Sequence, residues 1–162
     1  MSTLPQLFEE DISELNRAMQ ELLDKCEAGS ALIIDKGGFL ITECGEVRSL
    51  DTTTLAALSA ASYAATQSIA NLVGESDFNS VYQQGQGRSL LVMNVDAHCL
   101  LAILFKAEVS VGAVKYFGQA AIQKIARQLV RAQERNPEAG LDLSQLNLAD
   151  PSPLFQRKAA LL

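Results

Sequence analysis

Hydrophobic residues near the start of the chain recur at the spacing of an amphipathic helix. Acidic side chains fill the positions between them, so one face is apolar and the other charged. The pattern predicts a first helix over about residues 7–27, with Gly29 as a plausible stop. The apolar positions are Phe8, Ile12, Leu15, Met19, Leu22, Leu23 and Cys26.

Short apolar segments farther along the chain predict strands. Residues 31–35 are apolar and β-branched, Gly37 and Gly38 supply the positive φ angles of a tight hairpin, and residues 39–44 should return antiparallel. Three further strands are predicted after the second helix, with turns at 85–87 and 95–98 between them. They are a weak, polar edge strand at 77–84, a strand at 88–94, and the most apolar and therefore central strand at 99–106.

A second helix is predicted between these strand groups. Asp51 is a good N-cap, the alanine-rich segment 52–73 favours helix, and Gly74 can end it. A helical wheel puts the larger apolar residues on one side, which we expect to face the core: Leu55, Leu58, Ser62, Ala65, Ile69 and Leu72. The reverse side has no charge and carries Thr53, Ala56, Ala57, Ala60, Tyr63, Ala64, Gln67 and Asn71.

The uncharged reverse side of this helix predicts a second packing surface. A solvated helix face ordinarily carries Lys and Glu, whereas small side chains beside one aromatic anchor allow another helix to approach closely. Two simpler interpretations stay open. The helix is buried within its own chain, or it is rich in alanine only because alanine favours helix.

A third helix begins after Ser110, and its outer face bears Lys124, Arg127 and Arg131. Six basic and two acidic residues lie between 106 and 135, which by itself is typical of a solvated face. The helical spacing of apolar residues ends at Pro137. We therefore expect a domain over 1–135 and a tail over 136–162 that acts as a strap or binds a partner.

Composition and charge narrow the classes of function. The 162 residues are 48% hydrophobic and carry a net charge of −6, which argues against nucleic-acid binding because that affinity comes largely from Lys and Arg. Three widely spaced cysteines suggest neither a disulfide framework nor a zinc site. The same cysteine usage makes a reducing cytoplasm the expected location, and no apolar run approaches the ~20 residues of a membrane span.

The sequence offers few candidate catalytic residues. His98 is the only histidine and falls in a predicted turn, with Cys99 beside it on the opposite sheet face. Neither of the glycine-rich phosphate-binding motifs is present, and the carboxylates cluster on the outer face of the first helix. We expect no catalytic centre, cofactor or metal site, with a small-ligand sensor or enzyme near His98 as the alternative from another class.

Three segments in order resemble the Roadblock/dynein light chain family, and most closely its bacterial members of the MglB type. They are Ala31-Leu-Ile-Ile-Asp-Lys-Gly-Gly-Phe39, Asp51-Thr-Thr-Thr-Leu-Ala-Ala-Leu58 and Ser110-Val-Gly-Ala-Val114. The resemblance implies an α+β fold: a five-stranded antiparallel sheet with the second helix on one face and the first and third on the other. It also implies a homodimer in which the third strands, here around Phe78, Ser80 and Tyr82, pair edge to edge and the second helices meet.

The same resemblance implies a partner. MglB-type proteins bind Ras-like GTPases of the MglA type and stimulate GTP hydrolysis, so the uncharged side of the second helix would serve the dimer, the GTPase or both. A partner can accelerate hydrolysis by ordering the switch loops, which we favour here, or by inserting an arginine, for which Arg48 and Arg88 are the candidates. The alternative is a scaffold subunit that leaves GTP turnover unchanged.

Overall fold

The computed structural model describes residues 4–135 and 140–141. Within them a five-stranded antiparallel sheet has the strand order β3-β2-β6-β5-β4, which confirms the predicted fold class. Two further short strands, β1 and β7, pair with each other outside this sheet. The elements are β1 (Leu4–Pro5), α1 (Glu9–Cys26), β2 (Ser30–Asp35), β3 (Leu40–Gly45), α2 (Thr52–Leu72), β4 (Ser80–Gln84), β5 (Arg88–Asn94), β6 (Cys99–Lys106), α3 (Val111–Arg135) and β7 (Gly140–Leu141).

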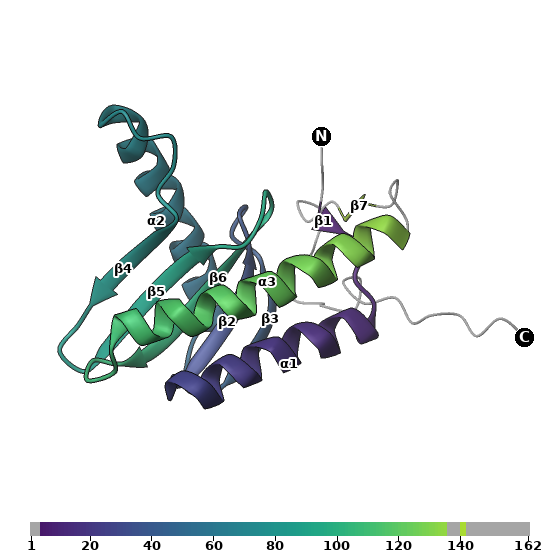
Figure 1. The fold of residues 1–162 in the computed structure, drawn as a ribbon, viewed down its shortest axis with the longest axis horizontal. Coiled ribbons are helices and arrows are strands. Elements are labelled where there is room, and N and C mark those ends of the chain that lie inside the picture. The colour runs from purple at the N-terminus through teal and green to yellow at the C-terminus, as the bar shows by residue number, and fades with distance from the viewer. Residues whose placement is uncertain (1–3, 136–139, 142–162) are drawn as a thin grey trace, which may run out of the picture.

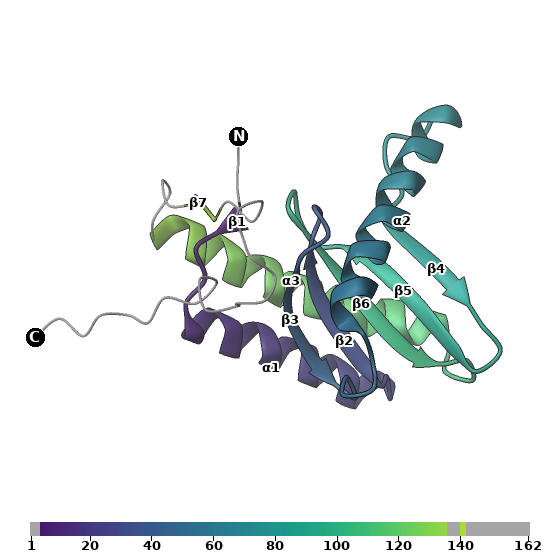
Figure 2. The ribbon, with the colours of Figure 1, turned by 180° about the vertical axis from the view of Figure 1, so that it is seen from behind.

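The helices form two layers around the sheet. Helices α1 and α3 lie side by side on one face, and α2 crosses the other (Figures 1 and 2). Alternate residues of each strand point to opposite faces, so the sheet contributes to two separate cores. Ile33, Leu91 and Leu101 belong to the larger core under α1 and α3. Leu32 and Leu100 belong to the smaller core under α2.

The predicted turns and caps are present in the structure. Gly38 has φ 101° in the hairpin between β2 and β3, a left-handed conformation that glycine adopts without steric cost, whereas the positive φ predicted for Gly37 is not observed. Asp51 accepts a hydrogen bond from the Thr54 backbone N–H at 3.0 Å and so caps α2. The Ser110 hydroxyl accepts one from the Ala113 N–H at 3.4 Å at the start of α3.

The sequence did not predict β1 or its pairing with β7. Leu4 lies opposite Leu141 in this ribbon, and Leu4 and Leu7 are buried in the larger core. In the first turn of α1, the carboxylate of Asp11 accepts hydrogen bonds from the Phe8 N–H and from the Gln128 amide of α3, both at 2.7 Å. Of the predicted tail, only residues 140–141 are within the described part of the chain.

Candidate functional site

The inner face of α2 consists of residues that the helical wheel placed outside. Ala56, Ala60 and Tyr63 are buried at 0%, 4% and 5% exposure, in one cluster with Leu32 and Leu100 of the sheet. These three residues are therefore covered by their own chain, and the prediction that they form a docking surface is wrong. The simpler interpretation, burial within the same chain, holds for this side of the helix.

Packing distance explains why the small residues face inward. Alanine side chains let the helix backbone approach the sheet closely, and a single large ring, Tyr63, fills the remaining space. The approach is close at the hairpin as well, because a Cβ added to Gly38 would stand 3.3 Å from the Ala57 Cα. The helical wheel assigned the side with the larger apolar residues to the core. That criterion fails for a helix whose backbone lies this close to a sheet, because the small side chains then face inward.

The outer face of α2 is apolar and uncharged. Leu58, Ile69 and Leu72 are 64%, 52% and 86% exposed, and Val73, just beyond the helix, is also exposed. None of the 21 residues of α2 is charged. A stripe of large apolar side chains on a helix without charges is typical of a surface that another protein covers. The exposed apolar residues thus lie on the side of the helix that was expected to face the core; we call this surface the α2 outer face (Leu58, Ile69, Leu72 and Val73).

The remaining predicted residues of this helix divide into two groups. Thr53, Ala57, Ala64 and Asn71 are exposed and flank the α2 outer face. Gln67 is half-buried, and its side-chain amide donates to the Phe78 carbonyl at 2.8 Å and accepts from the Phe78 N–H at 3.4 Å. Gln67 therefore holds the connection that leads into β4.

Strand β4 is one of the two end strands of the sheet. Ser80 and Tyr82 lie in it as predicted, whereas Phe78 precedes its first residue, so Phe78 is not part of the edge strand. The strand is uncharged, with sequence SVYQQ, and pairs with β5 in an unbroken register. It adjoins α2, because the Gln83 amide donates to the Ser62 hydroxyl at 3.5 Å.

The other end strand, β3, differs from β4 in ways that discourage pairing. Its register with β2 shifts between Ile33 and Ile34, which is a β-bulge, and it carries the charged Glu43 opposite Leu32. Bulges and inward-pointing charges are the usual protection of a free edge. Strand β4 carries neither of these features.

Lys36 and Tyr63 join the hairpin after β2 to α2. The Lys36 ammonium lies 5.6 Å from the centre of the Tyr63 ring, within the range of a cation–π contact. Burial raises the pKa of the Tyr63 hydroxyl above its usual value, and the nearby Asp77 carboxylate raises it further. Tyr63 thus stays neutral and positions α2 from beneath.

The two candidate arginines lie at the same end of the sheet. Arg48 and Arg88 are both exposed, and each lines a surface hollow that also includes Glu46. Arg48 precedes α2 by four positions, which places it beside the first turn of that helix. Leu72 is the last residue of α2, at the opposite end of the helix from this first turn.

The surroundings of His98 do not favour nucleophilic chemistry. The Asp96 carboxylate accepts the backbone N–H groups of His98 and Cys99, each at 2.8 Å, and so serves the turn. Cys99 is fully buried, and this burial raises the pKa of its thiol far above the usual value. Among residues 4–135 and 140–141, no group of three or more His, Cys, Asp or Glu side chains could hold a metal ion.

The same described residues include no helix long and apolar enough to cross a membrane. The family model for the Roadblock/LC7 domain matches residues 15–105, and the chain belongs to this family. The match spans β2 to β6 and most of α1, and thus includes α2 and β4. A comparison with the curated proteins found no match.

Solved structures of MglB share the fold over most of the chain. One described as MglB with tetrameric arrangement is 30% identical, with a TM-score of 0.75, and the alignment covers 82% of this chain and 99% of that one. Gliding protein mglB from Thermus thermophilus is 29% identical, with a TM-score of 0.73 and coverage of 81% and 99%. Myxococcus xanthus MglB is 28% identical, with a TM-score of 0.72 and coverage of 78% and 95%.

Proposed function

We propose that this chain is a homodimeric regulator that binds a Ras-like small GTPase of the MglA type and stimulates its GTP hydrolysis. The observation that carries the proposal is the α2 outer face, which leaves three large apolar side chains in water on a helix without charges. Membership of the Roadblock/LC7 family and the likeness to MglB supply the class of partner.

The dimer would form through β4 and α2 together. Pairing two β4 strands antiparallel joins the sheets of two copies and satisfies the free backbone groups of the regular, uncharged edge. Because α2 adjoins β4 at Ser62, the same two-fold arrangement brings the two α2 outer faces toward each other. The side chains nearest the axis would be buried in the dimer, and the rest would be left for the GTPase.

Stimulation of hydrolysis would come from ordering the GTPase's own switch loops. An apolar helix surface can hold such loops in the conformation that positions the attacking water, and this requires no catalytic side chain from the regulator. An inserted arginine is the other physical route, and of the two candidates only Arg48 stands next to α2. The α2 outer face favours the first route.

Phosphate release from an MglA-type GTPase, measured under single-turnover conditions with increasing amounts of this protein, tests the proposal. The wild-type chain should raise the rate, and Leu58→Asp should abolish the increase. Val130→Asp is the matched control, because Val130 is 54% exposed on α3, at the opposite face of the molecule. Measurable binding with an unchanged rate would identify a scaffold and refute the regulatory part of the proposal.

Arginine variants separate the two routes. If switch ordering is the mechanism, Arg48→Ala and Arg88→Ala should each retain most of the stimulated rate. A loss of about a thousandfold in either variant would instead identify an inserted arginine.

A further inference from the structure

The surface formed by α1 and α3 lies on the opposite side of the sheet from the α2 outer face (Figures 1 and 2). A groove runs between the two helices. Its charged lining comes from both of them and consists of Glu14, Arg17, Glu21, Lys124, Arg127 and Arg131. None of these residues takes part in the proposed dimer or GTPase contact.

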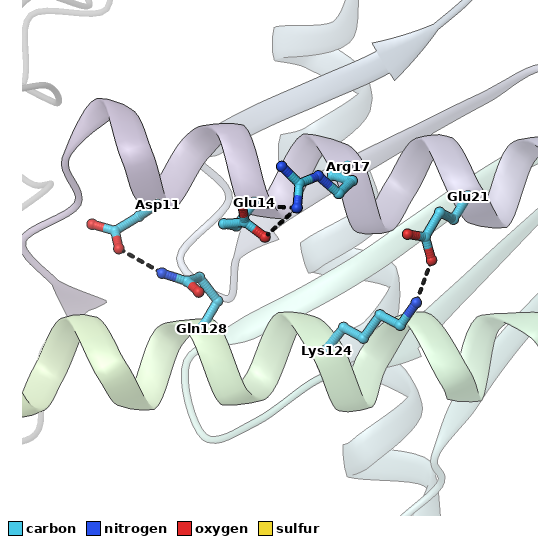
Figure 3. Close-up of polar contacts among 6 residues, drawn as sticks. All are labelled: Asp11, Glu14, Arg17, Glu21, Lys124 and Gln128. Atoms are coloured by element: carbon cyan, nitrogen blue, oxygen red, sulfur yellow. Dashed lines mark hydrogen bonds and ion pairs between the residues drawn. The ribbon is translucent and has the colours of Figure 1, made fainter.

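The charges of this groove do not cancel. Glu14 forms an ion pair with Arg17 at 3.1 Å, and Glu21 pairs with Lys124 across the two helices (Figure 3). Both carboxylates of the groove are thereby engaged. Within residues 4–135 and 140–141, neither Arg127 nor Arg131 forms an ion pair.

The two arginines are placed to act together. They are four residues apart on α3, so they point the same way and stand about 6 Å apart along the helix axis. Arg127 uses its Nε–H on the Gln123 carbonyl at 3.2 Å, which leaves the outer N–H groups of its guanidinium free to donate. Two exposed guanidiniums at this spacing match two carboxylates on one face of a facing helix or strand.

We propose that this α1–α3 groove docks an acidic segment of a partner protein, with Arg127 and Arg131 as the residues that bind its carboxylates. The neighbouring charges favour a protein segment over a nucleic acid. Glu9, Glu10 and Glu14 line the adjoining hollow beside Arg131, so a long polyanion that followed the groove would meet carboxylates. A short acidic segment that contacts only Arg127 and Arg131 would avoid them.

Fluorescence anisotropy with a labelled hexaglutamate peptide at low ionic strength tests this assignment. The double variant Arg127→Glu/Arg131→Glu should weaken binding at least about tenfold relative to wild type. The matched control is Lys106→Glu/Lys115→Glu, which makes the same change in net charge at two exposed lysines outside the groove. It should change the dissociation constant less than about twofold. Circular dichroism confirms that each variant is folded, and Arg127→Gln/Arg131→Gln replaces the reversal if it is not.

Four outcomes would overturn the assignment. Equal weakening by the two double variants would mean that only net charge matters. Displacement of the peptide by inorganic phosphate at similar concentrations would indicate a site for small anions, and displacement by a short oligothymidylate would indicate a nucleic-acid surface. A change in assembly mass on sedimentation of Arg127→Glu/Arg131→Glu would show that a second copy of this chain occupies the groove.

Discussion

A pair of substitutions in α2 tests which side of this helix faces the sheet. Leu58→Asp alters a side chain that is 64% exposed, and Ala60→Asp alters one that is 4% exposed only two positions away. Both variants add the same carboxylate to the same uncharged helix. We expect opposite phenotypes: Leu58→Asp should fold and lose self-association, whereas Ala60→Asp should fail to fold stably.

The magnitudes follow from burial. A fully buried leucine contributes about 2 kcal/mol, so the exposed two thirds of Leu58 offers about 1.3 kcal/mol per protomer to a partner. In a symmetric dimer the loss is twice that, and the dissociation constant should rise about a hundredfold. In contrast, the carboxylate of Ala60→Asp would lie unpaired against Leu32 and Leu100, at a cost of about 3–5 kcal/mol of unfolding free energy.

Sedimentation velocity over a range of concentrations measures the first effect, and urea unfolding followed by circular dichroism measures the second. The unfolding experiments should be done on dilute protein, because a dimer that dissociates on unfolding makes the midpoint depend on concentration. The assignment of the two faces would be refuted if Leu58→Asp unfolded the protein while Ala60→Asp remained native and monomeric.

Two further predictions concern the ends of the larger core. Hydrogen bonds from Arg135, Gln128 and the Phe8 N–H hold the pKa of Asp11 below its usual value although burial raises it, so this contribution to stability is present at neutral pH and lost as pH falls through the lowered pKa. Asp11→Asn should therefore lower the unfolding free energy at pH 7, obtained from urea unfolding, by about 1–3 kcal/mol and have little effect in strong acid. An equal effect at both pH values would contradict this. Gly45→Ala should destabilise the protein by more than about 2 kcal/mol, because φ is 94° and the new Cβ would clash with the Gly29 carbonyl oxygen. In the same assay Gly74→Ala, with φ 79° and open space around the new Cβ, should cost about 1 kcal/mol.

Most of the fold could be predicted because its signals are local. The Gly37 and Gly38 hairpin, the Asp51 cap and the apolar strand at 99–106 each act over a few residues and were found where expected. The resemblance to a known family then predicted which helices lie on which face of the sheet. The pairing of β1 with β7 was not predicted, because each strand has only two residues and the paired residues are more than 130 positions apart in the sequence.

The candidate site was predicted only in part, for a physical reason. The absence of charge along α2 fits a helix whose small residues pack on the sheet, whereas a partner on its outer side stays a prediction. Which side meets the sheet depends on how closely the backbone approaches, and that distance is a tertiary property. Tyr63 packs against the sheet together with small alanines. Placing the alanine side of the helix on the sheet leaves Leu58, Ile69 and Leu72 exposed on the other side.

Hydrogen–deuterium exchange at increasing protein concentration tests the central claim most directly, that α2 and β4 form a surface made for another protein. Peptides that cover α2 and β4 should become more protected as the dimer forms, while those of α1 and α3 should not change. Protection confined to α1 and α3, or no change in any peptide while the mass doubles, would contradict the account.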